Sequence, residues 1–119
     1  MGDSRGLPER PVRARLFAQV RDIGFDGIEL GVDMLGGVSA TEGQVREIRE
    51  EFEGYGTPCV VLCGGGGASN PKTAAQSRES LLKAVEVAYW LGADVVNTTV
   101  GTPPRNPGMP GSFVGEPVS

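Results

Sequence analysis

The sequence contains no histidine and only two cysteines, Cys59 and Cys63, among its 119 residues. A structural zinc site takes four Cys or His ligands, so these two thiols cannot form one by themselves. They lie four residues apart in an apolar run typical of a β-strand, and that spacing is too long for a disulfide between them. We therefore expect both cysteines to be buried free thiols, and we assign no metal ligand.

Excess positive charge and long apolar runs are also missing. The formal net charge is -4 and the pI is near 4.8, with Arg residues scattered among Asp and Glu, so no basic face for nucleic acid is expected. No apolar run approaches the roughly 20 residues that span a bilayer, and residues 1–10 lack the apolar stretch of a secretory signal. We expect a cytoplasmic protein that binds neither nucleic acid nor membrane.

Glycine and proline are abundant, with 19 Gly and 9 Pro residues. This content exceeds that of an ordinary globular domain and indicates extensive loops. Residues 1–9 are polar and interrupted by Gly6 and Pro8, which predicts a disordered or loop N-terminus. Residues 102–119 predict a Pro/Gly-rich loop at the C-terminus. Residues 10–101 between them are long enough for one small domain.

Helices and strands are expected to alternate along residues 10–101. The predicted helices cover 10–23, 41–55 and 70–91, and the predicted strands cover 26–31, 58–63 and 94–100. Apolar positions at helical spacing form the expected stripes of the three helices: Val12, Leu16, Val20 and Ile23; Val45, Ile48, Phe52 and Tyr55; Ala74, Leu81, Val85 and Ala88. Alternation with short connections predicts parallel strands in an α/β fold.

Three parallel strands leave two open sheet edges. The run from Cys59 to Cys63 is apolar throughout, which is typical of a strand covered on both faces with a neighbour on each side. The first helix has no predicted strand before it. One hypothesis is therefore self-association through the open edges, with the chain serving as a non-enzymatic assembly module.

Two segments together resemble the xylose isomerase-like TIM barrels, the sugar phosphate isomerase/epimerase family. Residues 16–30 contain a helix followed by Gly-Phe-Asp-Gly-Ile-Glu-Leu, and residues 84–101 contain Ala-Tyr-Trp-Leu-Gly-Ala-Asp-Val-Val-Asn. The resemblance covers residues 10–101, less than half of a barrel of about 250 residues. It implies a partial (β/α)8 TIM barrel, from the N-terminal part of the fold, with about three parallel strands alternating with three helices.

The resemblance also implies a chemistry for the full-length family. Its members bind a divalent metal through Glu, Asp and His near the ends of later strands, and they move a proton beside the carbonyl of a sugar or sugar phosphate. No metal ligand can be assigned to this chain on that basis. We therefore expect the chain alone to be inactive, whichever sugar the family member uses.

Three residues are candidates for a substrate pocket. By resemblance, Glu29 matches a strand-end glutamate of the family and would point into the barrel mouth. Asn97 and Thr99 would share one face of the last predicted strand, where they could hydrogen-bond a sugar hydroxyl. The alternatives are a glutamate at position 29 that is solvated at a strand end or paired with an Arg, and polar side chains that only fill a barrel layer.

A glycine tetrad, Gly64 to Gly67, supports a different hypothesis. Gly64, Gly66 and Ser69 lie between a predicted strand and a predicted helix, where backbone N–H groups could hold a phosphate or nucleotide. The spacing lacks the third glycine of a dinucleotide motif and the Lys of a P-loop. A plain barrel loop is the alternative interpretation of the tetrad.

Overall fold

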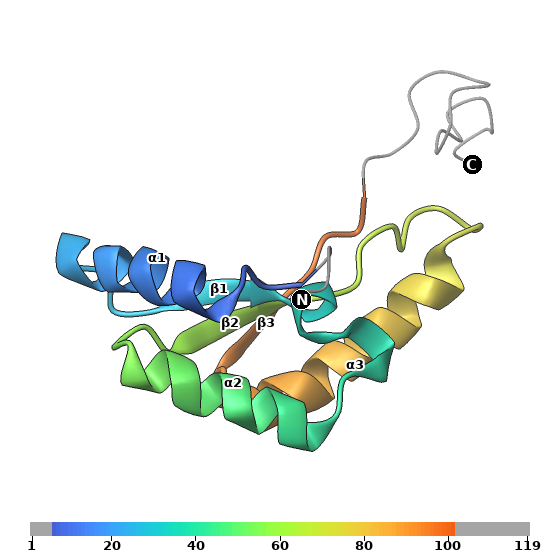
Figure 1. Cartoon of the computed structure of the whole chain (residues 1–119). Coiled ribbons are helices and arrows are strands. Elements are labelled where there is room, and N and C mark those ends of the chain that lie inside the picture. Colours follow the sequence, from blue (N-terminus) through green and yellow to red (C-terminus); the bar gives the residue numbers. More distant parts are fainter. Residues whose placement is uncertain (1–5, 102–119) are drawn as a thin grey trace.

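The protein is an α/β structure with three parallel strands in one sheet, seen in a computed structural model that describes residues 6–101 (Figure 1). The elements in chain order are α1 (Arg10–Ile23), β1 (Ile28–Gly31), the short 3-10 helices η1 (Val32–Leu35) and η2 (Gly37–Ser39), α2 (Glu42–Gly54), β2 (Cys59–Cys63), α3 (Ala74–Leu91) and β3 (Val95–Asn97). This confirms the predicted α/β class and the alternation. The C-terminal loop predicted for 102–119, and residues 1–5 of the predicted N-terminal loop, lie outside the described residues.

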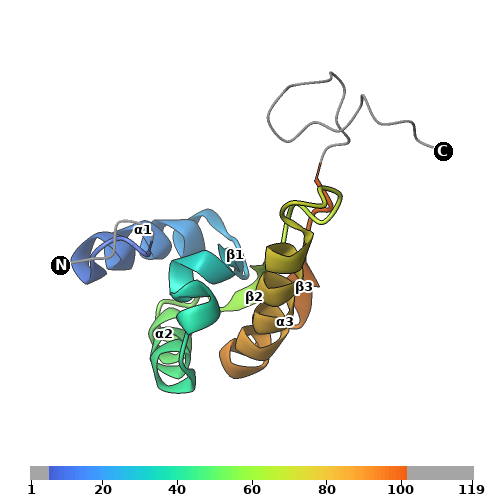
Figure 2. The same ribbon diagram turned by 90° about the vertical axis from the view of Figure 1, so that its right-hand side faces the viewer.

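The strand order β1-β2-β3 is the one that successive right-handed β-α-β units produce. Within the described range, β1 and β3 are the two edges of the sheet. Figure 2 shows α1 toward the β1 edge and α3 toward the β3 edge. The arrangement is a partial α/β barrel, because strands and covering helices follow one another around the sheet as they do in a (β/α)8 fold.

The two faces of the sheet differ in cover. Leu30 of β1 pairs with Leu62 of β2 in the parallel register, and both are buried on the face that carries α2 and α3 (Figure 1). Side chains alternate along a strand, so Glu29 and its register partners Val61 and Val95 belong to the opposite face. Val95 is 52% exposed, and no described helix covers this face. The prediction that β2 is covered on both faces is therefore wrong for the described part of the chain.

The second helix forms as its sequence predicts. The Thr41 hydroxyl accepts a hydrogen bond from the Gln44 N–H at 3.4 Å, which caps the first turn. Val45 and Phe52 are fully buried, and Ile48 and Tyr55 pack against the same core. The buried apolar stripe and the N-terminal cap are thus both as predicted for this helix.

The first helix has the predicted bounds but a different inner face. Of the expected stripe, Val12 and Leu16 are each 44% exposed and Ile23 is 74% exposed. The helix instead turns Phe17 toward α2, where its ring lies 4.7 Å from that of Phe52. Burial of a large aromatic ring decides the orientation, because no other described element covers the aliphatic stripe.

The third helix starts later than predicted, and of its predicted inner residues Ala88 is buried whereas Val85 is not. Asn70 and Pro71 lie in a turn, in which the Asn70 side chain accepts from the Lys72 N–H at 2.9 Å, and the helix begins at Ala74. The predicted core residue Val85 is 55% exposed. The buried residues of the helix are Ser77, Ala84, Val87, Ala88 and Leu91. Small side chains on this face let the helix approach the sheet closely.

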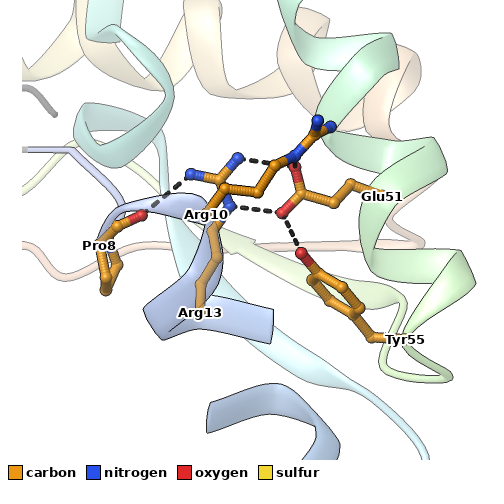
Figure 3. A network of polar contacts seen from close by, with 5 residues as sticks. All are labelled: Pro8, Arg10, Arg13, Glu51 and Tyr55. Carbon is orange, nitrogen blue, oxygen red and sulfur yellow. Dashed lines mark hydrogen bonds and ion pairs between the residues drawn. The ribbon is translucent and has the colours of Figure 1, made fainter. Parts of the chain in front are cut away.

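An ionic network joins α1 to α2 (Figure 3). The Arg13 guanidinium donates to both carboxylate oxygens of Glu51, and the Tyr55 hydroxyl donates to the same carboxylate at 2.6 Å. Arg10 adds a further contact at 3.1 Å, while Arg13 also donates to the Pro8 carbonyl at 2.9 Å. The Glu51 side chain is only 6% exposed. The bonds from Arg13 lower the pKa of Glu51 from 4.5 to about 2.

We expect Glu51→Gln to lower the free energy of unfolding at pH 7 by about 1 to 2 kcal/mol, because the charged carboxylate is the form that the network stabilises. The folded-state pKa is depressed, so the contribution is complete above the unfolded value of 4.5 and is lost as the pH falls toward about 2. Urea unfolding of both proteins between pH 7 and pH 2.5 measures the difference. Glu53→Gln is the matched control, because its exposed pair with Arg49 contributes about 0.5 kcal/mol or less. A difference between wild type and Glu51→Gln that did not shrink with acidification would contradict this assignment.

No helix among residues 6–101 combines the length and apolar character needed to cross a membrane.

Candidate functional site

The carboxyl ends of the three parallel strands meet at one edge of the sheet and place polar side chains there. Gly31, Cys63 and Asn97 are register partners at the last positions of β1, β2 and β3. In parallel α/β folds, this is the edge at which ligand sites are built. The candidate site therefore consists of the strand ends and the loops that follow them.

Two of the predicted pocket residues are in contact. Asn97 donates a hydrogen bond from Nδ2 to Oε2 of Glu29 at 3.2 Å, across a separation of 68 residues in sequence. Both side chains are exposed on the face that no described helix covers. Since β2 lies between β1 and β3, the two side chains reach toward each other over the middle strand. The pair presents a carboxylate and an amide side by side to solvent.

Thr99 was predicted to share a strand face with Asn97, but the structure does not place it there. The last strand ends at Asn97, so Thr98 to Val100 leave the sheet and alternation no longer places Thr99 on one face with Asn97. Thr99 Oγ1 lies instead 3.6 Å from the position that a Cβ would take on Gly66. The residue borders the glycine loop, residues 64–67.

The glycine loop is held by hydrogen bonds to both neighbouring elements. The Gly64 N–H donates to the Asn97 carbonyl at 3.0 Å, and the Gly65 N–H donates to Ser80 Oγ at 3.1 Å. The Ser69 N–H donates to the Val100 carbonyl at 2.7 Å. Of the residues predicted as a phosphate loop, Gly64 and Ser69 therefore already use their N–H groups within the protein.

Close packing explains why glycine occupies the start of this loop. A Cβ on Gly64 would lie 2.4 Å from the Cβ of Ala84, and a Cβ on Gly65 would lie 2.6 Å from Thr98 Oγ1. Gly65 and Gly66 also have positive φ angles of 78° and 102°, which other residues rarely adopt. The glycines let β2, α3 and the end of β3 approach one another.

A polar pocket of about 380 Å³ opens between η1, the glycine loop and α3. We call it the loop pocket. Its lining residues are Asp33, Gly65, Gly66, Gly67, Thr73, Gln76, Ser77 and Ser80. Our prediction from sequence missed Asp33 and the α3 residues, although Asp33 lies only two residues after the end of β1. Thr73, Ser77 and Ser80 also recur at helical spacing, and this polar stripe was the available signal.

The two thiols differ in burial. Cys59 is buried and Cys63 is half-buried, and both are free, which fits the prediction of free thiols but not of full burial for Cys63. Burial raises the pKa of the Cys59 thiol above its ordinary value, so this residue stays protonated at neutral pH. Its Sγ contacts the Val61 carbonyl at 3.1 Å.

The donor set does not fit a divalent metal. Within residues 6–101, no group of three or more His, Cys, Asp or Glu side chains is close enough to hold a metal ion. Glu29 is hydrogen-bonded to an amide, and Asp33 lies in the loop pocket among neutral groups. Residues 6–101 therefore do not form a complete divalent-metal site by themselves.

Comparison with known proteins gives one match. The family model described as xylose isomerase-like TIM barrel matches residues 17–117, which is most of the chain. The match includes β1, β2, β3 and the glycine loop. No curated protein and no solved structure matches the chain.

Proposed function

We propose that this chain, which belongs to the xylose isomerase-like TIM barrel family, supplies part of the substrate-binding end of a sugar isomerase or epimerase. Substrates in a (β/α)8 barrel bind at the carboxyl-terminal mouth of the barrel, where the loops and the inward-pointing side chains at the strand ends meet. In this chain the corresponding face of the sheet is the one that carries Glu29 and Asn97. The proposal concerns the whole barrel, of which the described residues form three strands.

The Glu29–Asn97 contact is the observation that carries the proposal. A carboxylate accepts hydrogen bonds only, whereas an amide both donates and accepts. Adjacent hydroxyl groups of a sugar offer the complementary donors and acceptors. Because Asn97 already donates to Glu29 at 3.2 Å, the amide holds the carboxylate in place before a sugar arrives.

These two residues would bind and orient the substrate. The parent reaction is a proton transfer beside the sugar carbonyl, in which a divalent metal would stabilise the developing negative charge. The described residues do not provide a fitting ligand set, so we assign no step of the reaction to them. We expect the 119-residue chain alone not to interconvert an aldose and a ketose.

A sugar titration tests the binding role. We expect an aldopentose or aldohexose to shift the backbone N–H signals of Glu29 and Asn97 and the side-chain NH2 signals of Asn97 in NMR spectra of the full chain, with a dissociation constant of about 10 mM. Glu29→Gln removes the charge that accepts from sugar hydroxyls and should weaken binding about three- to tenfold.

Glu50→Gln is the matched control, because Glu50 is exposed on α2 and belongs to no strand end. This variant should bind as the wild type does. If the Glu29 and Asn97 signals stay unchanged at about 100 mM sugar, the proposed binding role is wrong. Equal binding by wild type and Glu29→Gln would also contradict it.

A further inference from the structure

We propose that the loop pocket binds uncharged hydroxyl groups of a sugar and disfavours a phosphate group. The inference deepens the proposed function, on which it rests, because it states which of two substrate classes the site accepts. It depends on the charge and the hydrogen-bonding capacity of the residues that line the pocket.

Neutral groups that can both donate and accept dominate the lining. Ser80 Oγ accepts from the Gly65 N–H at 3.1 Å, which leaves the Ser80 hydroxyl proton and one lone pair for a ligand. Thr73 Oγ1 donates to the Gly67 carbonyl at 2.6 Å and keeps its acceptor capacity. Gln76 adds an amide with both functions. Hydroxyl groups pair well with such mixed partners, because each hydroxyl is itself a donor and an acceptor.

Three features make the pocket unsuitable for phosphate. None of the residues that line it is Lys or Arg, and Asp33 contributes a carboxylate. The N–H group of Gly65, the first glycine of the lining, is committed to Ser80. A phosphate site normally offers N–H donors and cationic side chains together. A phosphate dianion here would meet a like charge without a compensating cation.

The loop pocket and the Glu29–Asn97 pair both lie at the carboxyl ends of the strands, the pocket on the helix side and the pair on the opposite face. The bond from the Gly64 N–H to the Asn97 carbonyl joins the first residue of the loop to the last residue of β3. Asp33 lies in η1, directly after the end of β1. The pocket therefore supplies a second set of polar groups at the same end of the sheet as the proposed sugar site.

The test compares an aldohexose with its 6-phosphate and with inorganic phosphate, in NMR titrations of the full chain at matched ionic strength. We expect the neutral sugar to shift the amide signals of residues 65–67 and Ser80, and its phosphate ester to bind at least about threefold more weakly. Asp33→Asn should bring the ester to within about twofold of the neutral sugar. Asp26→Asn is the control with the same change in net charge at an exposed site outside the pocket, and it should leave the preference unchanged.

Each other outcome overturns the inference. Tighter binding of the ester, or shifts of the same amides by inorganic phosphate alone, would identify a phosphate site instead. A preference that Asp26→Asn removes as well as Asp33→Asn does would mean that overall charge is responsible. If no probe shifts the amide signals of residues 65–67 and Ser80, the loop pocket does not bind sugar and the inference is wrong. The signals of Glu29 and Asn97 report separately on the proposed function.

Discussion

Replacing Phe52 by alanine is expected to lower the free energy of unfolding by about 3 to 5 kcal/mol. The Phe52 side chain is completely buried, and its ring lies 4.7 Å from Phe17 and 5.6 Å from Tyr55. The substitution would leave a cavity where α1, α2 and the sheet meet. Since a domain of this size has a stability of only about 5 to 15 kcal/mol, the variant should be close to unfolding at 37 °C.

Urea unfolding followed by circular dichroism measures this loss. Phe25→Ala is the matched control, because it removes the same ring from a position that is 59% exposed. We expect the control to change stability by no more than about 0.5 kcal/mol. Equal losses of stability in the two variants would show that the cluster of Phe17, Phe52 and Tyr55 is not the centre of the core.

Replacing Gly64 by alanine is expected to cost about 2 to 3 kcal/mol. The new Cβ would lie 2.4 Å from the Cβ of Ala84, which is attached directly to the α3 backbone and cannot rotate away. The chain can accept the methyl group only if α3 moves away from the end of β2. Such a movement would also disturb the bond from the Gly65 N–H to Ser80 and hence the loop pocket.

Two further variants make the test specific. Gly43→Ala places a methyl group in α2 with no atom within 4 Å, and it should raise stability by about 0.5 to 1 kcal/mol. In the double variant Gly64→Ala with Ala84→Gly, the new methyl group at position 64 takes the space that the Ala84 methyl group leaves. The loss of stability in the double variant should therefore be smaller than the sum of the losses in the two single variants. Additive costs would show that the two residues do not pack against each other.

The local signals in the sequence were sufficient for much of the fold. The bounds of α1 are as predicted, and β2 lies within the range predicted for it. Capping chemistry and helical spacing account for the Thr41 cap of α2 and for the burial of Val45 and Phe52. The glycines that end α1 and α3 adopt left-handed conformations, as glycine at a helix end commonly does. These features depend on neighbouring residues only.

Features that depend on distant contacts were not predicted. The inner face of α1 is set by Phe17 meeting Phe52, and no periodicity within residues 10–23 contains that information. The start of α3 was placed at Asn70 because Asn followed by Pro suits a helix cap. The Asn70 side chain instead forms a local turn with Lys72, an arrangement that the same two residues also favour.

The candidate site was predictable in part for the same reason. Glu29 and Asn97 could be named because both lie near strand ends, and the parallel register then brings them together. Asp33 and Ser80 were not named, because their proximity depends on how η1 and α3 pack around the glycine loop. The glycine tetrad suggested phosphate binding, but Gly64 has a structural reason to be glycine, because a Cβ at this position would clash with the Cβ of Ala84.

The most direct test of the proposed function uses the polypeptide that the source cells make from the natural gene. Its intact mass and its aldose–ketose isomerase and epimerase activities should be measured together, with Glu29→Gln and Glu50→Gln variants of the same polypeptide. We expect a chain of about 250 residues or more, active on a neutral sugar, in which Glu29→Gln lowers kcat/KM about tenfold and Glu50→Gln does not. Isomerase or epimerase activity that Glu29→Gln leaves unchanged would contradict the assignment of this sheet face to a sugar site.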